Sequence, residues 1–482
     1  MCQACFAPSS ANGRLHFCHC GTPETLAAMR RIEADISRRQ MLGGMSAVIG
    51  MFAGFGLAPR ELRAQTAGRP LLLTNLRFFD GETLSIRGGN DILVRDGRIA
   101  ALPAPGQGPE DAERIDCGGR TVIPGLIDTH WHTTLVAVSQ LVAMTQEPGF
   151  VHLVAGREAG ATLMRGFTTV RDVGGPAFAL QAAIDRGVVE GPRIFPAGAI
   201  ISQTSGHGDF RFANTLPKMP LDPASYPEAQ GMAAIADGVP EVLRRTREQL
   251  MKGASQIKIA AGGGVASQYD PLESLQFTEA EMRASVDAAA DWGTYVCAHV
   301  YTSPGIRRCL AAGVKSIEHG QLADEDTVRM MADAGAWWSI QPFLADEDAN
   351  QYTDPKAVAA QTAVSEGTVQ AFEWAQKHRV NWAFGTDILY GGGESQARQL
   401  AKLARFMSPL EALHRATGAA GELLALSGAR APYDGRLGVI AEGALADLLV
   451  IDGETDTDLS WLADSGNLRL IMKGGRVVKD SL

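Results

Sequence analysis

Eight short apolar runs with strand-like patterning fill the middle of this 482-residue chain, and stretches with helical patterning separate them. Strands that alternate with helices are typical of a parallel sheet, and eight such units predict an α/β fold of the (β/α)8 TIM-barrel type. An open, doubly wound sheet shows the same alternation and stays the alternative. The predicted strands are 122–128, 168–172, 193–201, 256–260, 295–298, 316–318, 337–341 and 382–385, and the clearest helical stretches are 140–166, 279–292, 324–334 and 368–378.

Both ends of the folded region have the pattern of short strands and tight turns. Asp96-Gly97 and Gly474-Gly475 are hairpin signals. Neither end has enough strands for a stable sheet of its own, so we expect 66–122 and 436–482 to form one small β-domain beside a barrel at 123–435. The strand-like runs at the two ends are 71–79, 91–94, 99–102, 446–451, 468–473 and 476–479.

The first 65 residues have the layout of an export signal. A twin arginine, Arg38-Arg39, precedes a Gly-rich, mildly apolar run at 41–58, and charged and small residues follow. We therefore leave 1–65 out of the fold and predict a periplasmic or secreted protein, or a cytoplasmic one if the leader does not function. An uncleaved membrane anchor is the alternative, but this run is short and rich in glycine for a spanning helix. No membrane contact is expected after processing.

Cysteines are concentrated ahead of that signal. Cys2, Cys5, Cys18 and Cys20, with His16 and His19 among them, have spacings that could hold zinc. A segment that is lost with the leader would have no such role, and both interpretations stay open. The rest of the chain has only Cys117, Cys297 and Cys309, an odd number that offers no disulfide framework.

The overall charge argues against a nucleic-acid partner. The formal net charge is -10, and hydrophobic residues make up 45% of the chain. These values are typical of an acidic globular protein, and the sequence has no basic stripe or aromatic-plus-basic groove. A small-molecule substrate is therefore the expected partner.

Candidate metal ligands follow the predicted strands in order. In an extended strand, residues two apart point to the same side, so His130 and His132 at the end of the first run can face one common point. The ends of strands collect on one face of a barrel, where the chemistry of such folds takes place. The other candidates that end on this face are Lys258, His299, His319 and Asp387.

Lys258 is an unusual member of this set. A lysine buried in a strand is unfavourable unless it is paired or altered, and an ammonium group cannot bind a metal. Carbamylation by carbon dioxide would turn the side chain into an anionic oxygen ligand that can bridge two metals. This modification would explain the position of a lysine among histidines.

The ordered set of motifs resembles the amidohydrolase superfamily, in particular the imidazolonepropionase-like branch with prolidase-type (Xaa-Pro) dipeptidases, N-acyl amino acid hydrolases and ochratoxin-degrading amidases. The resemblance spans about 70–482. Each motif is weak alone, and the order of the whole set is specific. The matching residues are Asp128-Thr-His-Trp-His132, Thr169-Val-Arg-Asp-Val-Gly174, Ser205-Gly-His-Gly-Asp209, Ile257-Lys-Ile259, Gly262-Gly-Gly-Val-Ala-Ser267, Ala298-His299, Ser316-Ile-Glu-His-Gly320 and Gly385-Thr-Asp387.

This resemblance implies a barrel with a β-sandwich built from both chain ends, two divalent metal ions, with zinc as the expected metal, and assembly into homo-oligomers. One metal would take His130, His132 and Asp387, the other would take His299 and His319, and carbamylated Lys258 would bridge them. Imidazole and carboxylate ligands suit zinc. The implied reaction is hydrolysis of an amide by metal-activated hydroxide, with Asp387 accepting the proton and delivering it to the leaving nitrogen.

Residues near the predicted strand ends are candidates for substrate contacts. His207 could donate to the substrate carbonyl or carboxylate, Tyr301 could bind a terminal carboxylate, and Val265 could present backbone groups to it. His207 as a solvated loop residue and Tyr301 as a packing residue are the alternatives. We expect Asp128 to orient a ligand histidine, with a strand-end cap as the alternative, and 210–237 to form a loop over the pocket.

The predicted function is hydrolysis of an amide bond in a dipeptide or N-acyl amino acid, including ochratoxin-type amides. A lactone, cyclic amide or phosphoester is an alternative substrate, since the same metals would activate water against it. The turn after Asp387, Ile388-Leu-Tyr-Gly-Gly-Gly393, matches no particular subgroup and leaves the leaving-group pocket open. From other classes, a periplasmic metal or ligand carrier and a non-catalytic assembly subunit stay possible.

Overall fold

The computed structural model describes residues 69–212, 214, 223–265, 269–349 and 352–482. The chain after Thr66 forms one compact unit. The predicted export signal and the leader cysteines lie outside the described residues. Among the helices that are described, none is both long enough and apolar enough to cross a membrane.

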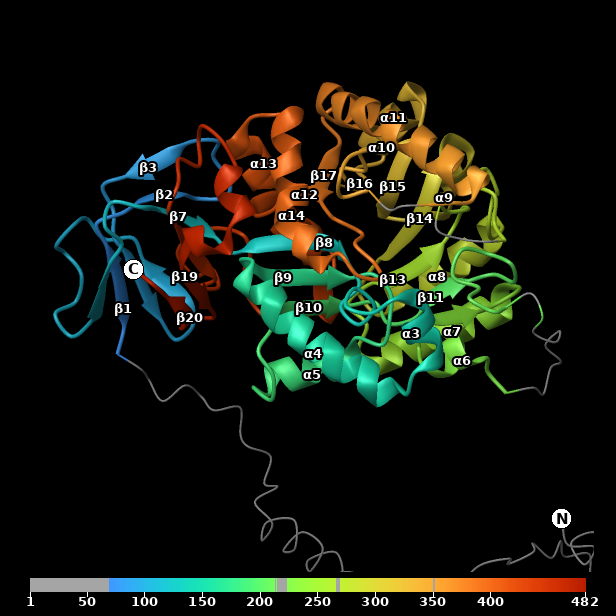
Figure 1. Cartoon of the computed structure of the whole chain (residues 1–482), viewed down its shortest axis with the longest axis horizontal. Helices are drawn as coiled ribbons and strands as arrows, with labels where there is room; N and C mark the ends of the chain where they lie inside the picture. The colour runs from blue at the N-terminus through green and yellow to red at the C-terminus, as the bar shows by residue number, and fades with distance from the viewer. Residues whose placement is uncertain (1–68, 213, 215–222, 266–268, 350–351) are drawn as a thin grey trace, which may run out of the picture. The chain divides into compact units, whose positions relative to one another are not determined.

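The two ends of the compact unit form two β-sheets, and one of these sheets combines strands from both ends (Figure 1). Strand β18 from the C-terminal part pairs antiparallel with β7, so both ends contribute to one six-stranded sheet. This sheet has the order β20-β19-β18-β7-β2-β3, with β2 (Arg77–Phe79), β3 (Ile86–Gly88), β7 (Thr121–Pro124), β18 (Leu448–Ile451), β19 (Leu468–Lys473) and β20 (Arg476–Asp480). The four-stranded sheet has the order β5-β4-β1-β6, with β1 (Leu71–Thr74), β4 (Ile92–Arg95), β5 (Arg98–Ala101) and β6 (Glu113–Asp116).

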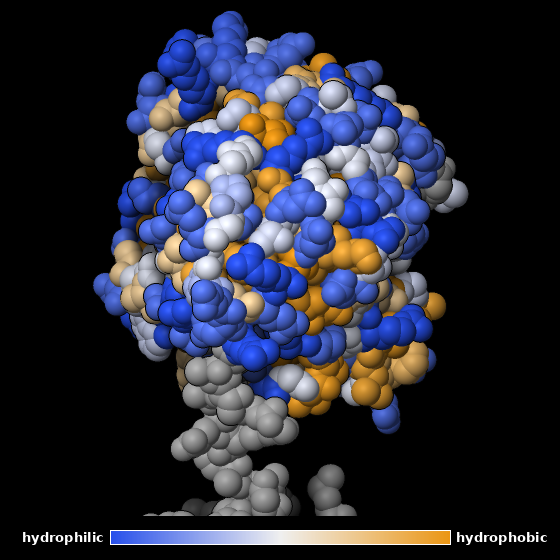
Figure 2. Space-filling view, turned by 90° about the vertical axis from the view of Figure 1, so that its left-hand side faces the viewer, coloured by the Kyte–Doolittle hydropathy of each residue, from blue (hydrophilic) through white to orange (hydrophobic). Residues whose placement is uncertain are grey.

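Turn chemistry and a shared core explain these two sheets. Asp96 and Gly97 connect β4 to β5 with φ angles of 50° and 76°, and Gly474 and Gly475 connect β19 to β20 with φ angles of 56° and 72°. Two successive positive φ angles are typical of the tight hairpin turns that the sequence indicated. Buried side chains from both sheets form one hydrophobic cluster that includes Leu73, Ile92, Val94, Val122, Val450 and Leu470. On the side that faces the viewer in Figure 2, hydrophilic side chains cover most of the surface and leave patches of hydrophobic surface between them.

The middle of the chain forms parallel sheets, which confirms the α/β class. A three-stranded sheet has the order β10-β9-β8, and a seven-stranded sheet has the order β12-β11-β13-β14-β15-β16-β17. Every strand pair in both sheets is parallel. The strands are β8 (Leu126–Trp131), β9 (Phe167–Asp172), β10 (Arg193–Pro196), β11 (Ile200–Ser202), β12 (Ala233–Ile235), β13 (Ile257–Ala260), β14 (Val296–Thr302), β15 (Ser316–Leu322), β16 (Trp337–Ile340) and β17 (Asn381–Phe384).

Helices lie outside these parallel strands, with α4, α5 and α7 along one side and α10 and α11 along the opposite side in Figure 1. The α-helices are α3 (Gln140–Thr145), α4 (Pro148–Met164), α5 (Phe178–Asp185), α6 (Tyr226–Ala229), α7 (Val239–Lys252), α8 (Glu279–Asp291), α9 (Ser303–Ala312), α10 (Glu325–Asp333), α11 (Pro355–Lys377), α12 (Gln396–Ala401), α13 (Pro409–Arg415) and α14 (Gly418–Ala425). The 3-10 helices are η2 (Gly393–Ser395), η3 (Lys402–Arg405), η4 (Gly428–Arg430), η5 (Ser460–Ala463) and η6 (Ser465–Asn467).

The outer strands of the two parallel sheets are neighbours. At the end of β8, the Thr129 hydroxyl donates to the Phe384 carbonyl of β17 at 2.8 Å, and the Asp387 amide donates to the His130 carbonyl at 2.8 Å. These bonds bring the first and last parallel strands of the chain side by side. The residues that follow both strands therefore meet at the same edge.

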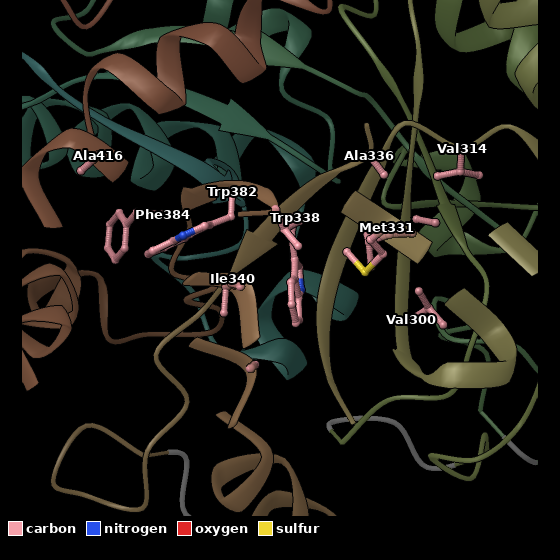
Figure 3. Close-up of a cluster of buried hydrophobic side chains, with 14 of the residues drawn as sticks. Val300, Val314, Met331, Ala336, Trp338, Ile340, Trp382, Phe384 and Ala416 are labelled. Carbon is pink, nitrogen blue, oxygen red and sulfur yellow. The ribbon is translucent and has the colours of Figure 1, made fainter. Parts of the chain in front are cut away.

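A large hydrophobic core holds the helices against the seven-stranded sheet (Figure 3). Trp338 of β16 and Trp382 of β17 are buried there with Phe384, and Met331 of α10 belongs to the same cluster. Burial of large apolar side chains contributes about 1.5–3 kcal/mol each. This packing gives the ends of the parallel strands a rigid support.

Several predicted boundaries are wrong for identifiable reasons. The run 122–128 divides at Gly125 between β7 and β8, where a Cβ would lie 2.0 Å from the Thr168 hydroxyl. The run 193–201 divides around Gly198, which has a φ of 78°. The helical stretch 140–166 divides into α3 and α4, because α4 begins at Pro148. Within 210–237, which was predicted as a loop, the structure forms α6 and β12.

Candidate active site

Two strand ends bring three of the predicted ligands into contact. His130 lies in β8, His132 follows directly, and Asp387 follows β17. The Nε2 atoms of both histidines lie 3.2 Å from the Asp387 Oδ1 atom. These side chains, 255 residues apart in sequence, therefore form one cluster at the edge where the first and last parallel strands meet.

The remaining predicted ligands join the same cluster from three neighbouring strands. The ring centroids of His299 in β14 and His319 in β15 are 4.4 Å apart, and those of His130 and His319 are 4.8 Å apart. Lys258 in β13 is 3% exposed and lines the same cavity. The cluster thus combines four imidazoles, one carboxylate and one buried lysine.

Each imidazole has one nitrogen fixed by a hydrogen-bond acceptor. The Nδ1–H groups of His130, His132 and His319 donate at 2.8–2.9 Å, and the Nε2–H group of His299 donates at 3.1 Å. In the neutral form of each ring, the other nitrogen has a lone pair that a metal can bind. The acceptors are Glu318 Oε2 for His130, the Gly174 carbonyl for His132, Gln341 Oε1 for His319 and the Gly263 carbonyl for His299.

This donor set fits a divalent metal. One ligand atom each from His130, His319 and Asp387 lie within 4.8 Å of one another, so this triad could hold an ion. Nitrogen and carboxylate oxygen donors are the ligands that zinc and similar ions prefer. The unprotonated ring nitrogens and a fully ionised carboxylate are the forms that such an ion requires.

Electrostatics around the cluster favour an ionised Asp387 and neutral rings at His299 and His319. At His132, burial lowers the pKa of the ring, but the hydrogen bond to Asp387 and its charge raise that pKa above the usual value. Burial opposes ionisation of Asp387, but the nearby imidazoles of His130 and His132 hold the pKa of its carboxyl well below the usual value. Burial holds the pKa of His299 and His319 well below that of a free histidine, so both rings are neutral at pH 7. Burial also lowers the pKa of Lys258, which increases the share of neutral amine.

The backbone at two of these residues is strained. His319 has a φ of 72° and Asp387 a φ of 53°, in the left-handed region that residues other than glycine rarely adopt. Such strain costs on the order of 1–3 kcal/mol per residue and is concentrated at functional sites. The surrounding fold therefore keeps both residues in this backbone conformation, although the strain lowers the free energy of unfolding.

Two buried charges behind His130 were not singled out as site residues. The Glu318 carboxylate accepts hydrogen bonds from Arg171 Nη2 at 2.8 and 2.7 Å, and both side chains are fully buried. Burial opposes ionisation of Glu318, but Arg171 holds its pKa well below the usual value. Both residues lie in strand-like runs of the sequence, where a charge requires a partner, and this signal could have identified them.

Asp128 contacts a predicted ligand histidine through the backbone amide of that histidine. Asp128 Oδ1 accepts from the backbone amides of His130 at 3.0 Å and Thr386 at 3.1 Å, and Oδ2 accepts from the Thr386 hydroxyl and Gln396. Among the described residues, Asp128 has no hydrogen bond to a histidine ring. It ties the segment of His130 to the segment of Asp387, which is closer to the strand-end cap that was the alternative.

His207 packs flat against the histidine cluster. Its ring is stacked on that of His299, with centroids 3.8 Å apart and planes at 5°, and its Nδ1 lies 3.4 Å from Asp270 Oδ2. A Cβ at Gly264 would lie 2.2 Å from the His207 ring. Glycine at 264 therefore leaves the space that the stacked ring occupies, and the solvated-loop interpretation of His207 does not fit this packing.

Tyr301 and Val265 lie on one wall of the cavity. Tyr301 is 4% exposed and is stacked on His319, with ring centroids 4.9 Å apart. Val265 packs against a small cluster of Leu272, Tyr301 and Val364. Tyr301 thus packs at the rim, as in the alternative interpretation, while it also faces the cavity.

The cavity has a volume of about 520 Å³, and every predicted metal ligand and substrate-contact residue lines it. A second apolar wall of the cavity contains residues from helix α3 and from three separate loops. We call it the Phe210 wall, and it consists of Leu135, Met144, Phe210, Leu389 and Tyr390. The segments of Phe210 and Tyr390 were expected near the pocket, but their joining with Leu135 and Met144 into one wall could not be predicted, because these residues lie up to 255 positions apart and form no motif.

Comparisons with known proteins agree with this geometry. The profile of the amidohydrolase family matches residues 121–478. Ochratoxinase from Aspergillus niger is 31% identical over 371 residues, which cover 74% of this chain and 75% of that protein. A prolidase complexed with N-methylphosphonate-L-proline is 35% identical, with a TM-score of 0.78 over 85% of this chain and 100% of the other. A Xaa-Pro dipeptidase with methionine bound in its active site is 30% identical, with a TM-score of 0.74 and the same coverage.

The chain belongs to the amidohydrolase family, in its prolidase- and ochratoxinase-like branch. It is a hydrolase that acts on carbon–nitrogen bonds of a small molecule, and its fold is an α/β fold like the TIM barrel. The family resemblance predicted from the ordered motifs is therefore confirmed. Members of this family generally use a divalent metal, which agrees with the donor set of the cluster.

Proposed function

We propose that this protein is a binuclear metal-dependent hydrolase that cleaves the amide bond of an N-acyl amino acid or dipeptide. The observation that supports it most is the single cluster of four imidazoles, Asp387 and Lys258, in which each ring has one nitrogen free for a metal. In this proposal the two parallel sheets close into a (β/α)8 barrel, and the two mixed sheets form a β-sandwich beside it. The bonds between β8 and β17 support the closure.

The metal ligands are assigned as the resemblance implies. His130, His132 and Asp387 would hold one ion, His299 and His319 the other, and carbamylated Lys258 would bridge the two, with zinc as the expected metal. When bound, such ions supply Lewis acidity that polarises a carbonyl and acidifies water near neutral pH. The buried position of Lys258 among these ligands supports its modification, because a carbamate would replace an unpaired ammonium with an anionic ligand.

Two side chains of the cavity would carry out the proton transfer and hold the substrate. Asp387 would accept a proton from the attacking water and deliver it to the leaving nitrogen, since its carboxylate lies at the centre of the cluster. His207, stacked on His299, would donate to the substrate carbonyl or carboxylate. The hydroxyl of Tyr301 and backbone groups at Val265 would complete the carboxylate site.

The two walls of the cavity indicate how the substrate is oriented. The wall with Tyr301 and Val265 offers hydrogen-bond donors beside apolar surface, which suits the amino-acid half. Arg211 also lines the cavity, but Asp209 neutralises it through bonds of 2.7 and 2.5 Å. The Phe210 wall is apolar, so it suits a large apolar or aromatic acyl group.

A substrate panel tests this function. We expect the purified protein to hydrolyse N-acyl amino acids. The value of kcat/KM should rise from acetyl to benzoyl and longer acyl groups, because larger acyl groups contact more of the Phe210 wall. Phe210→Ala should reduce kcat/KM for the large acyl group roughly 10- to 100-fold and leave the acetyl compound nearly unchanged, because the missing contact is apolar. The measurement is steady-state kinetics on both substrates.

Phe150→Ala is the matched control, because Phe150 is half-exposed on α4 and does not line the cavity. It should keep the wild-type preference. Equal losses on both substrates in Phe210→Ala would contradict the assigned orientation. Rapid cleavage of a lactone, cyclic amide or phosphoester in the same panel, with no amide cleaved, would replace the proposed substrate class, and tight metal binding without any turnover would indicate a carrier.

The location and assembly of the protein stay proposals as well. We propose that the leader directs export by the twin-arginine route to the periplasm or the medium, with the cytoplasm as the location if the leader does not function. A homo-oligomer is the expected assembly. Both proposals rest on the sequence and the family resemblance alone.

A further inference from the structure

We propose that Glu318 and Arg171 are positioning residues that fix His130 in its metal-binding form and make the ion at His130 and His132 the more tightly held of the two. This inference rests on the proposed metal site. Nothing in the ordered motifs or the family resemblance assigns a role to either residue. The observations that support the inference are the hydrogen bonds around His130 and the burial of the side chains that form them.

The contact between Glu318 and His130 fixes one tautomer. His130 Nδ1 lies 2.8 Å from Glu318 Oε2, and both side chains are at most 1% exposed. An ionised carboxylate only accepts hydrogen bonds, so the proton is held on Nδ1. The Nε2 lone pair then faces the cluster, where Asp387 Oδ1 lies 3.2 Å away.

Arg171 keeps the Glu318 carboxylate in place. Arg171 Nη2 donates to both carboxylate oxygens, and its Nε donates to the Thr129 carbonyl next to His130. The Ser316 hydroxyl donates to Glu318 Oε1 at 2.6 Å. The pair thus connects β9, β15 and the segment of β8 that carries His130, and every oxygen of the carboxylate is satisfied.

The other three imidazoles have weaker support. His132 and His299 donate to the carbonyls of Gly174 and Gly263, and His319 donates to the amide of Gln341. These acceptors are neutral. A carboxylate behind a ligand histidine raises the basicity of the ring, and loss of such a partner costs about 10- to 100-fold in metal affinity. The two metal positions should therefore differ in affinity.

A metal titration of Glu318→Gln tests this inference. In the wild type, competition with a chromophoric chelator should show two zinc equivalents of unequal affinity. In Glu318→Gln, the tighter equivalent should weaken about 10- to 100-fold, while the weaker one changes little. Asp447→Asn is the matched control, because Asp447 pairs with Arg193 at 3.0 and 3.2 Å and neither residue lines the cavity. Both zinc affinities should stay at the wild-type values.

A double variant separates positioning from simple stabilisation. Glu318→Gln leaves Arg171 buried without its counter-charge, so its thermal unfolding temperature should fall and folding is at risk. Arg171→Met/Glu318→Gln removes both charges and should regain most of the unfolding temperature. The tighter zinc equivalent should still be weakened about 10- to 100-fold, because the charge behind His130 is still absent.

Two results would overturn the inference. The first leaves the proposed function intact, and the second contradicts the proposed metal site as well. If the wild type binds two zinc ions and the folded double variant has wild-type affinity for both, the pair is only structural, and the proposed function stands. If the folded wild type binds no zinc, the proposed metal site fails, and this inference fails with it.

Discussion

Replacing Asp387 with Asn should lower kcat by about 10²- to 10⁴-fold while most of the bound metal is retained. The amide keeps an oxygen near the Nε2 atoms of His130 and His132, which lie 3.2 Å from Asp387 Oδ1. It cannot accept a proton at neutral pH, so the transfer from water to the leaving nitrogen is lost. Steady-state kinetics together with metal analysis of the same sample measures both quantities.

Asp434→Asn is the control for this variant. Asp434 pairs with Arg98 on the surface, and its side chain is fully exposed, so kcat and metal content should match the wild type. A wild-type kcat in Asp387→Asn would contradict the proton-transfer role. Loss of both metals in Asp387→Asn would show that the residue acts as a ligand before any role in proton transfer.

Replacing Lys258 with Ala should remove a ligand that both ions share. Loss of a residue that only supports a ligand lowers metal affinity about 10- to 100-fold. Loss of Lys258 itself should lower metal affinity by more than this, and activity should fall with it. The shortened side chain leaves a space beside the cluster that propionate can enter and in which its carboxylate can stand in for the carbamate. Added propionate should therefore restore part of the activity.

Lys258→Met is the matched variant for the rescue, because its side chain fills the same space. It should be as inactive as Lys258→Ala and should not respond to propionate. Activity assays with and without propionate compare the two variants. Full activity in Lys258→Ala would contradict the bridging role, and an equal response of both variants to propionate would contradict the carbamate model.

Most strands of the parallel region could be predicted, because each of them is an apolar run between helical segments. The breaks at Gly125 and Gly198 could not, since they depend on contacts distant in sequence, such as that of Gly125 with Thr168. The short strand β12 (Ala233–Ile235) lies in a stretch rich in Pro and Ala, and only its pairing with β11 defines it. The local sequence pattern therefore predicted most of the helices and strands, and tertiary contacts determine where they begin and end.

The candidate ligands could be predicted because each polar residue ends an apolar run, and parallel strands bring such ends together. The supporting contacts depend on pairs far apart in sequence. Glu318 is 188 residues from His130 and 147 from Arg171, and no local pattern connects them. For the same reason, the sequence could not show that Asp128 contacts His130 through the backbone amide of that residue and also binds the amide of Thr386.

The metal content of the folded, purified protein tests the central claim most directly. Elemental analysis after dialysis against metal-free buffer should give two divalent transition-metal ions per chain, since two sets of free ring nitrogens, Asp387 and Lys258 face one cavity. A folded sample that contains no transition metal, and takes up none when zinc is added, would contradict the proposed hydrolase.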